Sequence, residues 1–85
     1  MSKVEIYSSA YCPYCVRAKA LLVQKAVEFT EYEVDRQPEL RVVMMDRSKR
    51  TSVPQIFIND QHIGGCDELF ALEANKKLDE ILKTN

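Results

Sequence analysis

Two cysteines separated by two residues, Cys12 and Cys15, form the segment of this sequence best suited to covalent chemistry. In the first turn of a helix, residues three apart lie about 5 to 6 Å from each other, which suits an unstrained disulfide. Cys12 would stand at the helix start, where unpaired backbone N–H groups and the helix dipole favour an anion. Because a thiolate is the nucleophile in thiol–disulfide exchange, we predict that Cys12 attacks and that the more covered Cys15 resolves the product.

The same cysteine spacing also occurs in structural zinc sites, which need four ligands at tetrahedral geometry. The other side chains that could complete such a site are Cys66 and His62. Pro13 and the strand–helix–strand pattern around it favour a redox helix, so we predict no metal. A zinc site and a purely structural buried pair of cysteines remain the alternatives.

A strand and a helix must hold the two cysteines in place. Val4–Tyr7 alternates as a strand, and Ser8–Tyr11 forms a loop that leads to Cys12. Pro13 suits the first helical position, where its missing N–H is not needed, so we expect a helix from there to about Lys25. The face of this helix that should pack inward is formed by Cys15, Ala18, Leu22 and Ala26.

A second strand and a second helix follow. Residues 30–34 place Thr30, Tyr32 and Val34 on one face with glutamates between them, which is typical of a strand with one wet face. Pro38 then opens a helix. The mainly apolar stripe of this helix is formed by Leu40, Val43, Met44 and Arg47.

The last third of the chain predicts a hairpin and two helices. The strands Gln55–Ile58 and Gln61–Ile63 flank a two-residue turn, Asn59-Asp60, whose side chains tolerate positive φ. The final helices come after Gly64-Gly65, with a break near Asn75. The order βαβ, then α, then ββα predicts an α/β thioredoxin fold, in which helices flank both faces of a four-stranded mixed sheet.

Length and composition limit the function further. A chain of 85 residues can bury a single core, so we expect one domain over residues 1–85. Thirteen acidic and twelve basic residues give a net charge of -1, which argues against nucleic acid as a partner. No apolar stretch approaches the ~20 residues of a membrane span, and a charge precedes any apolar run at the start. We therefore expect a cytoplasmic protein, in which three cysteines favour catalysis over a disulfide framework.

Three motifs occur in order: C-P-Y-C at Cys12–Cys15, T-S-V-P at Thr51–Pro54 and G-G-C-D at Gly64–Asp67. Over nearly the whole chain, the sequence resembles the small bacterial dithiol glutaredoxins of the C-P-Y-C type. The resemblance implies a glutathione-dependent oxidoreductase that reduces protein–glutathione mixed disulfides and protein disulfides. It implies glutathione as the reducing co-substrate, no permanently bound cofactor and a monomer that donates electrons to redox enzymes. The implied protein partners carry glutathionylated or disulfide-bonded cysteines, and ribonucleotide reductase is one candidate.

The resemblance also implies where glutathione binds. The residues concerned are Tyr14, Arg41, Ser52, Val53, Pro54, Gly65, Cys66 and Asp67. In this family the peptide bond that matches Val53-Pro54 is cis, which turns the Val53 backbone toward an extended tripeptide. The N–H groups of Cys66 and Asp67 would hold the γ-glutamyl carboxylate, and Asp67 would pair with the adjacent ammonium.

The sequence departs from the family at three positions. A lysine that helps to bind the glycyl carboxylate is usual where this chain has Ser9, which leaves Arg41 as the main cation at that end. We expect tuned or weaker glutathione affinity, because one exposed ion pair is worth at most ~1 kcal/mol. Ala26 and Lys49 stand where the family has glycine, which affects the loop conformations. A thioredoxin-like protein that is reduced by a reductase, and a metal-binding module, are the rival functions.

Overall fold

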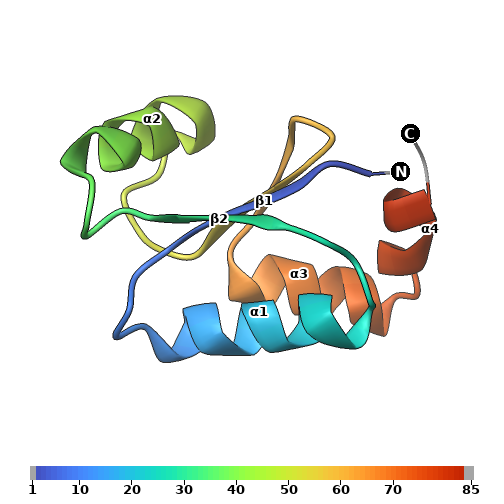
Figure 1. Ribbon diagram of the computed structural model, residues 1–85. Helices are drawn as coiled ribbons and strands as arrows, with labels where there is room; N and C mark the ends of the chain where they lie inside the picture. The colour runs from blue at the N-terminus through green and yellow to red at the C-terminus, as the bar shows by residue number, and fades with distance from the viewer. Residues whose placement is uncertain (1, 84–85) are drawn as a thin grey trace.

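The computed structural model describes residues 2–83 of the chain (Figure 1). Its elements are β1 Val4–Ser8, α1 Pro13–Gln24, β2 Thr30–Glu33, α2 Pro38–Ser48, β3 Gln55–Ile58, β4 Gln61–Gly64, α3 Cys66–Ala74 and α4 Leu78–Lys83. The strands form one sheet in the order β2-β1-β3-β4. β1 is parallel to β2, whereas β1 with β3 and β3 with β4 are antiparallel. This mixed sheet confirms the predicted thioredoxin fold.

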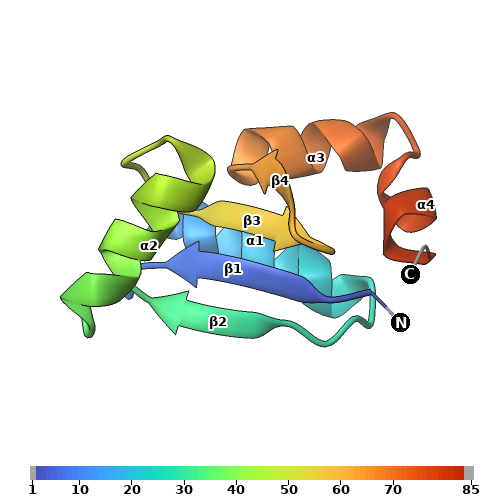
Figure 2. The ribbon, with the colours of Figure 1, turned by 90° about the horizontal axis from the view of Figure 1, so that it is seen from above.

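The helices form two layers around the sheet. Figures 1 and 2 show α1 and α3 side by side on one face and α2 alone on the other. In the part of the chain that the structure describes, no helix is long and apolar enough to cross a membrane. The layers bring the C-terminal end of β1 and the start of α1 close to the start of α3. The cysteine motif, at the start of α1, therefore lies beyond the C-terminal end of β1 and beside the start of α3.

Each face of the sheet carries its own apolar cluster because side chains alternate along the strands. Ile6, Ile56 and Ile58 face α1 and α3, where Leu22 and Leu69 pack against them. The cluster on the opposite face, toward α2, consists of Tyr7, Val34, Met44 and Phe57. All of β1 is buried, because β1 is a central strand covered on both faces.

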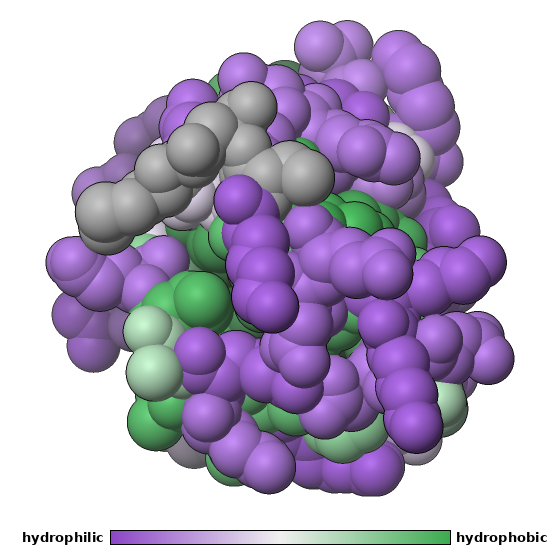
Figure 3. Space-filling model, turned by 90° about the vertical axis from the view of Figure 1, so that its right-hand side faces the viewer, coloured by the Kyte–Doolittle hydropathy of each residue, from purple (hydrophilic) through white to green (hydrophobic). Residues whose placement is uncertain are grey.

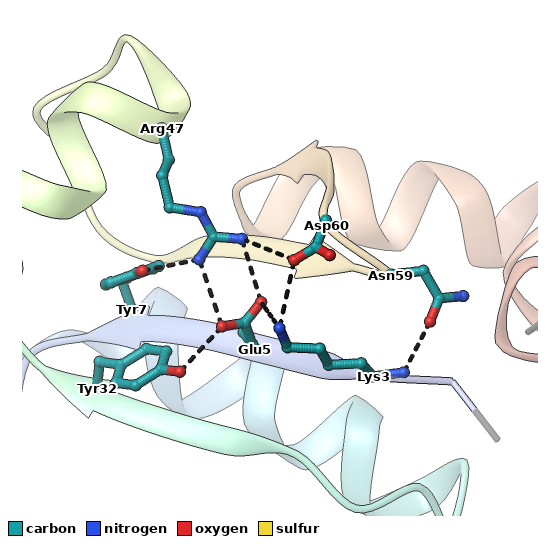
Figure 4. A network of polar contacts seen from close by, with 7 residues as sticks. All are labelled: Lys3, Glu5, Tyr7, Tyr32, Arg47, Asn59 and Asp60. Atoms are coloured by element: carbon teal, nitrogen blue, oxygen red, sulfur yellow. Dashed lines mark hydrogen bonds and ion pairs between the residues drawn. The ribbon is translucent and has the colours of Figure 1, made fainter.

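Glu5 and Arg47 form the centre of a polar network between the sheet and α2 (Figure 4). Two guanidinium nitrogens of Arg47 lie 3.1 and 3.4 Å from the carboxylate oxygens of Glu5, and Arg47 donates to the Tyr7 hydroxyl at 2.8 Å. Tyr32 donates to Glu5 at 2.9 Å. Burial opposes ionisation of Glu5, but these hydrogen bonds outweigh it and lower the pKa of the carboxyl. Arg47, which the helical stripe places against the sheet, thus makes polar contacts there.

Two predicted inward positions are wrong. Ala26 was expected on the inner face of the first helix, but α1 ends at Gln24 and Ala26 is exposed, with φ of 58°. Val43 was expected in the stripe of the second helix, but its side chain is 43% exposed, whereas Met44 is fully buried. Only a narrow line of α2 contacts the sheet, so a residue next to that line faces solvent.

The turns carry the predicted conformations. Asn59 and Asp60 have φ of 52° and 66°, which confirms the two-residue hairpin turn. Asn75 caps the end of α3, which confirms the predicted break before α4. Lys49, with φ of 61°, ends α2 in the left-handed conformation that glycine adopts most readily. Ala26 and Lys49 therefore keep a glycine-like backbone without a glycine.

The end of the molecule that carries α4 is covered mostly by hydrophilic side chains (Figure 3). Lys25, the residue that caps the end of α1, forms ion pairs with two other helices in this region. Its ammonium nitrogen lies 2.7 Å from the Glu73 carboxylate and 3.1 Å from that of Asp79. Since Glu73 belongs to α3 and Asp79 to α4, one lysine joins three helices.

Candidate active site

Cys12 is the N-cap residue of α1. Its backbone is extended, and Pro13 takes the first helical position, as predicted. The Sγ atom of Cys12 accepts a hydrogen bond from the backbone N–H of Cys15 at 3.1 Å. The side chain is only partly buried, so a substrate sulfur can reach it. An N-cap that accepts a backbone N–H is a site where a helix stabilises negative charge, which suits a thiolate.

Cys15 differs sharply from Cys12 although it lies one turn away. It has no solvent exposure, and both cysteines are free thiols in this structure. Burial, assisted by the hydrogen bond with Cys12, raises the pKa of Cys15 to about 12. Cys15 is therefore a protonated, covered thiol at neutral pH, and Cys12 is the accessible member of the pair.

The loop before β3 faces Cys12. The Val53-Pro54 peptide bond is cis, which confirms what the resemblance implied. The carbonyl oxygen of Val53 lies 3.8 Å from the Sγ atom of Cys12. Backbone groups of this loop therefore lie beside the sulfur, in a position to pair with an extended chain.

A groove of about 180 Å³ runs between this loop and the start of α3. It is lined by Tyr14, Arg50, Ser52, Val53, Pro54, Gln55, Gly65, Cys66, Asp67 and Glu68. The structure thus brings together all the residues predicted for glutathione binding except Arg41. Their part in binding stays a prediction.

Three residues of the groove, Arg50, Gln55 and Glu68, were missed in the sequence. Glu68 accepts a hydrogen bond from the Gly65 N–H at 2.6 Å, and this bond is the main reason that the pKa of Glu68 is lowered. Its other carboxylate oxygen lies 3.5 Å from Arg50. A glutamate three residues after a helix cap is a known capping signal, which could have identified Glu68. Arg50 and Gln55 carry no such signal.

Gly64 is required by the way in which Glu68 folds back. It has φ of +123°, and a Cβ atom at this position would lie 2.8 Å from the Cγ atom of Glu68. Residues that carry a side chain rarely adopt that φ, so the Gly64-Gly65 pair permits both the turn and the close approach of Glu68. The turn places the first residues of α3, Cys66 and Asp67, in the lining of the groove.

Arg41 lies on α2, beside the groove lining. It pairs with Asp35 at 3.3 Å and donates to the carbonyl oxygen of Thr51 at 3.4 Å. Ser9, which replaces the usual family lysine, donates to the other carboxylate oxygen of Asp35. The contact with Thr51 places Arg41 next to the Ser52–Pro54 segment of the groove.

His62 and Cys66, the two side chains considered for a zinc site, have other partners. The His62 ring lies 2.7 Å from the side-chain oxygen of Gln55, and burial lowers the pKa of His62. Cys66 is buried in the cluster beneath α3, and burial raises its pKa. Within residues 2–83, no group of three or more His, Cys, Asp or Glu side chains is placed to hold a metal ion.

Comparison with known proteins agrees with this geometry. The family model of glutaredoxin matches residues 4–63. The chain is 57% identical to glutaredoxin 3 of Escherichia coli over 83 residues, which cover 98% of this chain and 100% of that protein. The chain belongs to the glutaredoxin family. This glutaredoxin therefore has the thiol–disulfide oxidoreductase chemistry for which the two cysteines are arranged.

Solved structures of glutaredoxins have the same fold. The solution structure of a glutaredoxin from Brucella melitensis is 55% identical, with a TM-score of 0.85 over 96% of this chain and 89% of that one. A crystal structure of a buckwheat glutaredoxin–glutathione complex is 28% identical, with a TM-score of 0.88 over 95% of this chain and 76% of that one. The fold of this glutaredoxin thus resembles that of a relative solved with glutathione.

Proposed function

We propose that this glutaredoxin is a glutathione-dependent enzyme that reduces protein–glutathione mixed disulfides and protein disulfides. The observation that carries the proposal is that the two thiols differ in solvent exposure and lie beside a groove. Cys12 is accessible at a helix start, Cys15 is buried one turn away, and the groove adjoins the Val53 backbone. The solved complex of a related glutaredoxin with glutathione supports the choice of co-substrate.

The first cycle uses Cys12 alone. Its thiolate attacks the glutathione sulfur of a mixed disulfide, so a bond forms between Cys12 and glutathione and the substrate leaves as a thiolate that takes up a proton. A second glutathione thiolate then attacks the glutathione sulfur bound to Cys12. Glutathione disulfide is released and the Cys12 thiolate is restored. Each turnover thus consumes one free glutathione, because the other half of the glutathione disulfide comes from the mixed disulfide itself.

The second cycle uses both cysteines and reduces a protein disulfide. Cys12 attacks one sulfur of the disulfide and is joined to the protein substrate. Cys15 then attacks the Cys12 sulfur, the substrate leaves reduced, and Cys12 and Cys15 form a disulfide that two glutathione molecules reduce in turn. Because burial raises the pKa of Cys15, its proton must leave as it attacks. The departing substrate thiolate is a suitable acceptor for that proton.

Glutathione would lie along the groove as an extended tripeptide. The start of α3 offers the N–H groups of Cys66 and Asp67 to the γ-glutamyl carboxylate, and the Asp67 carboxylate to the ammonium. The Val53 backbone would pair with the cysteinyl residue, next to Cys12. Arg41 would meet the glycyl carboxylate. Tyr14, Ser52, Pro54 and Gly65 would form the walls of this site.

The proposed setting is that of a monomer in the cytoplasm that donates electrons to redox enzymes. Its protein partners would carry glutathionylated or disulfide-bonded cysteines, ribonucleotide reductase being one candidate. The similarity to glutaredoxin 3 of Escherichia coli over the full length of that protein supports a comparable role.

Two serine variants test the proposal. We expect Cys12→Ser to abolish turnover of a glutathione mixed disulfide, and Cys15→Ser to keep this activity while losing the reduction of a protein disulfide. Val23→Ser, at an exposed position on the same helix, is the matched control and should keep both activities. Comparable activities in the two cysteine variants would contradict the assigned roles.

Two further measurements separate the rival functions. Failure of glutathione to reduce the oxidised Cys12–Cys15 form would favour a protein that depends on a reductase. Stoichiometric zinc, or an iron chromophore, in protein purified without oxygen would favour a metal-binding module.

A further inference from the structure

Arg41 is already paired within the chain. Its guanidinium lies 3.3 Å from the Asp35 carboxylate and donates to the Thr51 carbonyl oxygen at 3.4 Å. Thr51 directly precedes Ser52 and Val53, which line the groove. α2, which carries Arg41, lies on the opposite face of the sheet from α3 (Figure 1). Arg41 thus lies just outside the groove lining, on α2 and against the loop that carries Ser52 and Val53, whereas the start of α3 lines the groove itself.

Asp35 joins two segments that flank the site. One of its carboxylate oxygens pairs with Arg41 on α2, and the other accepts a hydrogen bond from Ser9 in the loop that leads to Cys12. The side chains of Arg41 and Asp35 are 40% and 49% exposed, so an anion from solution can reach both. Asp35 therefore neutralises the charge of Arg41 but leaves the guanidinium accessible to solvent.

We propose that Asp35 competes with glutathione for Arg41 and thereby sets how tightly the groove holds the glycyl carboxylate. This inference rests on the proposed function. A tripeptide with its γ-glutamyl end at α3 and its sulfur at Cys12 directs its other end toward α2. The carboxylate there meets a guanidinium that is already paired, so binding requires it to displace or to share the Asp35 carboxylate.

The effect is limited by solvent. Exposed ion pairs contribute little, because water screens both charges and the long side chains lose freedom on pairing. Removal of the Asp35 charge should therefore strengthen binding about two- to fivefold, the ratio that corresponds to a pair of this kind. Asp35 is a positioning residue that acts through Arg41, so the rate of sulfur exchange on Cys12 should not change.

The variant Asp35→Asn tests this directly, because it keeps the shape of the side chain and an acceptor for Ser9. We expect the KM for a glutathione mixed disulfide to fall about two- to fivefold with kcat unchanged. The dissociation constant of S-methylglutathione, measured by NMR titration, should fall by the same factor and does not depend on turnover. Asp35→Ser, which also removes the charge, should act in the same direction.

Three controls isolate the contact between Arg41 and the glycyl carboxylate of glutathione. Asp46→Asn removes a charge from an 84% exposed side chain on the same helix as Arg41 and should change neither constant. S-methylglutathione with an amidated glycyl carboxylate should bind the unmodified chain and Asp35→Asn equally. In an Arg41→Gln background, the Asp35→Asn change should have no effect.

The outcomes separate this inference from the proposed function. A dissociation constant or KM that is unchanged or higher in Asp35→Asn, or an equal gain with the amidated tripeptide, would overturn the competition. Absence of any glutathione-dependent turnover in the unmodified chain would instead refute the proposed function, and the NMR comparison would still decide the role of Asp35.

Discussion

Replacement of Arg47 by methionine tests how strongly the network between α2 and the sheet stabilises the fold. Arg47 contacts the Glu5 carboxylate at 3.1 and 3.4 Å, donates to Tyr7 at 2.8 Å and lies 4.0 Å from the centre of the Phe57 ring. The Glu5 side chain is only 6% exposed. Methionine keeps much of the apolar packing but leaves this carboxylate without its main cation.

The expected loss is large for one substitution. Removal of one partner from a buried ion pair reduces the free energy of unfolding by about 3–5 kcal/mol. Glu5 keeps its hydrogen bond from Tyr32, and the Arg47 side chain is 25% exposed, so we expect the lower end, about 3 kcal/mol. For a chain of this size, that corresponds to a fall in Tm of about 12–24 °C.

The pH dependence supplies the sharper test. In the unmodified chain the folded pKa of Glu5 is below its ordinary value of 4.5. The stabilisation from ionised Glu5 is therefore present above pH 4.5 and is lost as the pH falls through the folded pKa. In Arg47→Met, burial raises the pKa of Glu5 with less opposition. The variant should thus differ most from the unmodified chain at pH 7 and least at acidic pH, where the carboxyl is neutral.

Urea unfolding followed by circular dichroism at pH 7 and at pH 3.5 measures both effects. Arg36→Met is the matched control, because Arg36 is 80% exposed and pairs only with Glu33 among the described residues. It should change the free energy of unfolding by less than about 0.5 kcal/mol. If Arg47→Met lost no more stability than this control, or lost as much at pH 3.5 as at pH 7, the reasoning would be wrong.

Two other predictions concern the positive-φ residues Ala26 and Lys49 and the reactivity of the cysteines. Ala26→Gly and Lys49→Gly should each raise the free energy of unfolding by about 0.5–1 kcal/mol, because glycine relieves a positive φ but makes the unfolded chain more flexible. Urea midpoints measure this, and Ala20→Gly within α1 should lower stability by about 1 kcal/mol instead. Since burial raises the pKa values of Cys15 and Cys66, iodoacetamide should modify only Cys12 in the folded, reduced chain at pH 8, and all three cysteines in urea. Mass spectrometry counts the groups, and rapid labelling of Cys15 in the folded chain would contradict its burial.

The order of elements was predictable because it depends on local patterns. Alternation marked the first two strands, Pro13 and Pro38 marked two helix starts, and Asn59-Asp60 marked the hairpin of the last two strands. The two positions that were wrong, Ala26 and Val43, lie at the end of one helix and beside the contact line of another. Helical periodicity gives the direction of a side chain but not the width of the surface that covers it.

The site was predictable in part for a similar reason. Most of the groove residues belong to the three motifs, so their resemblance to the family placed them together. Arg50 and Glu68 meet across the groove only because the loop before β3 and the start of α3 come together in space. Asp35 has no motif of its own, and only its contacts with Ser9 and Arg41 reveal it.

By itself, the sequence determined the chemistry: two cysteines at the spacing of one helical turn, with a proline between them that starts the helix. The sequence predicted Cys15 as the more covered thiol, but only the tertiary structure decided that it is fully buried while Cys12 stays accessible, and which charges pair around them. The physical reason is that burial and charge pairing depend on segments distant in the chain. Local sequence specifies a helix start, but the elements packed around it decide how much water reaches each sulfur.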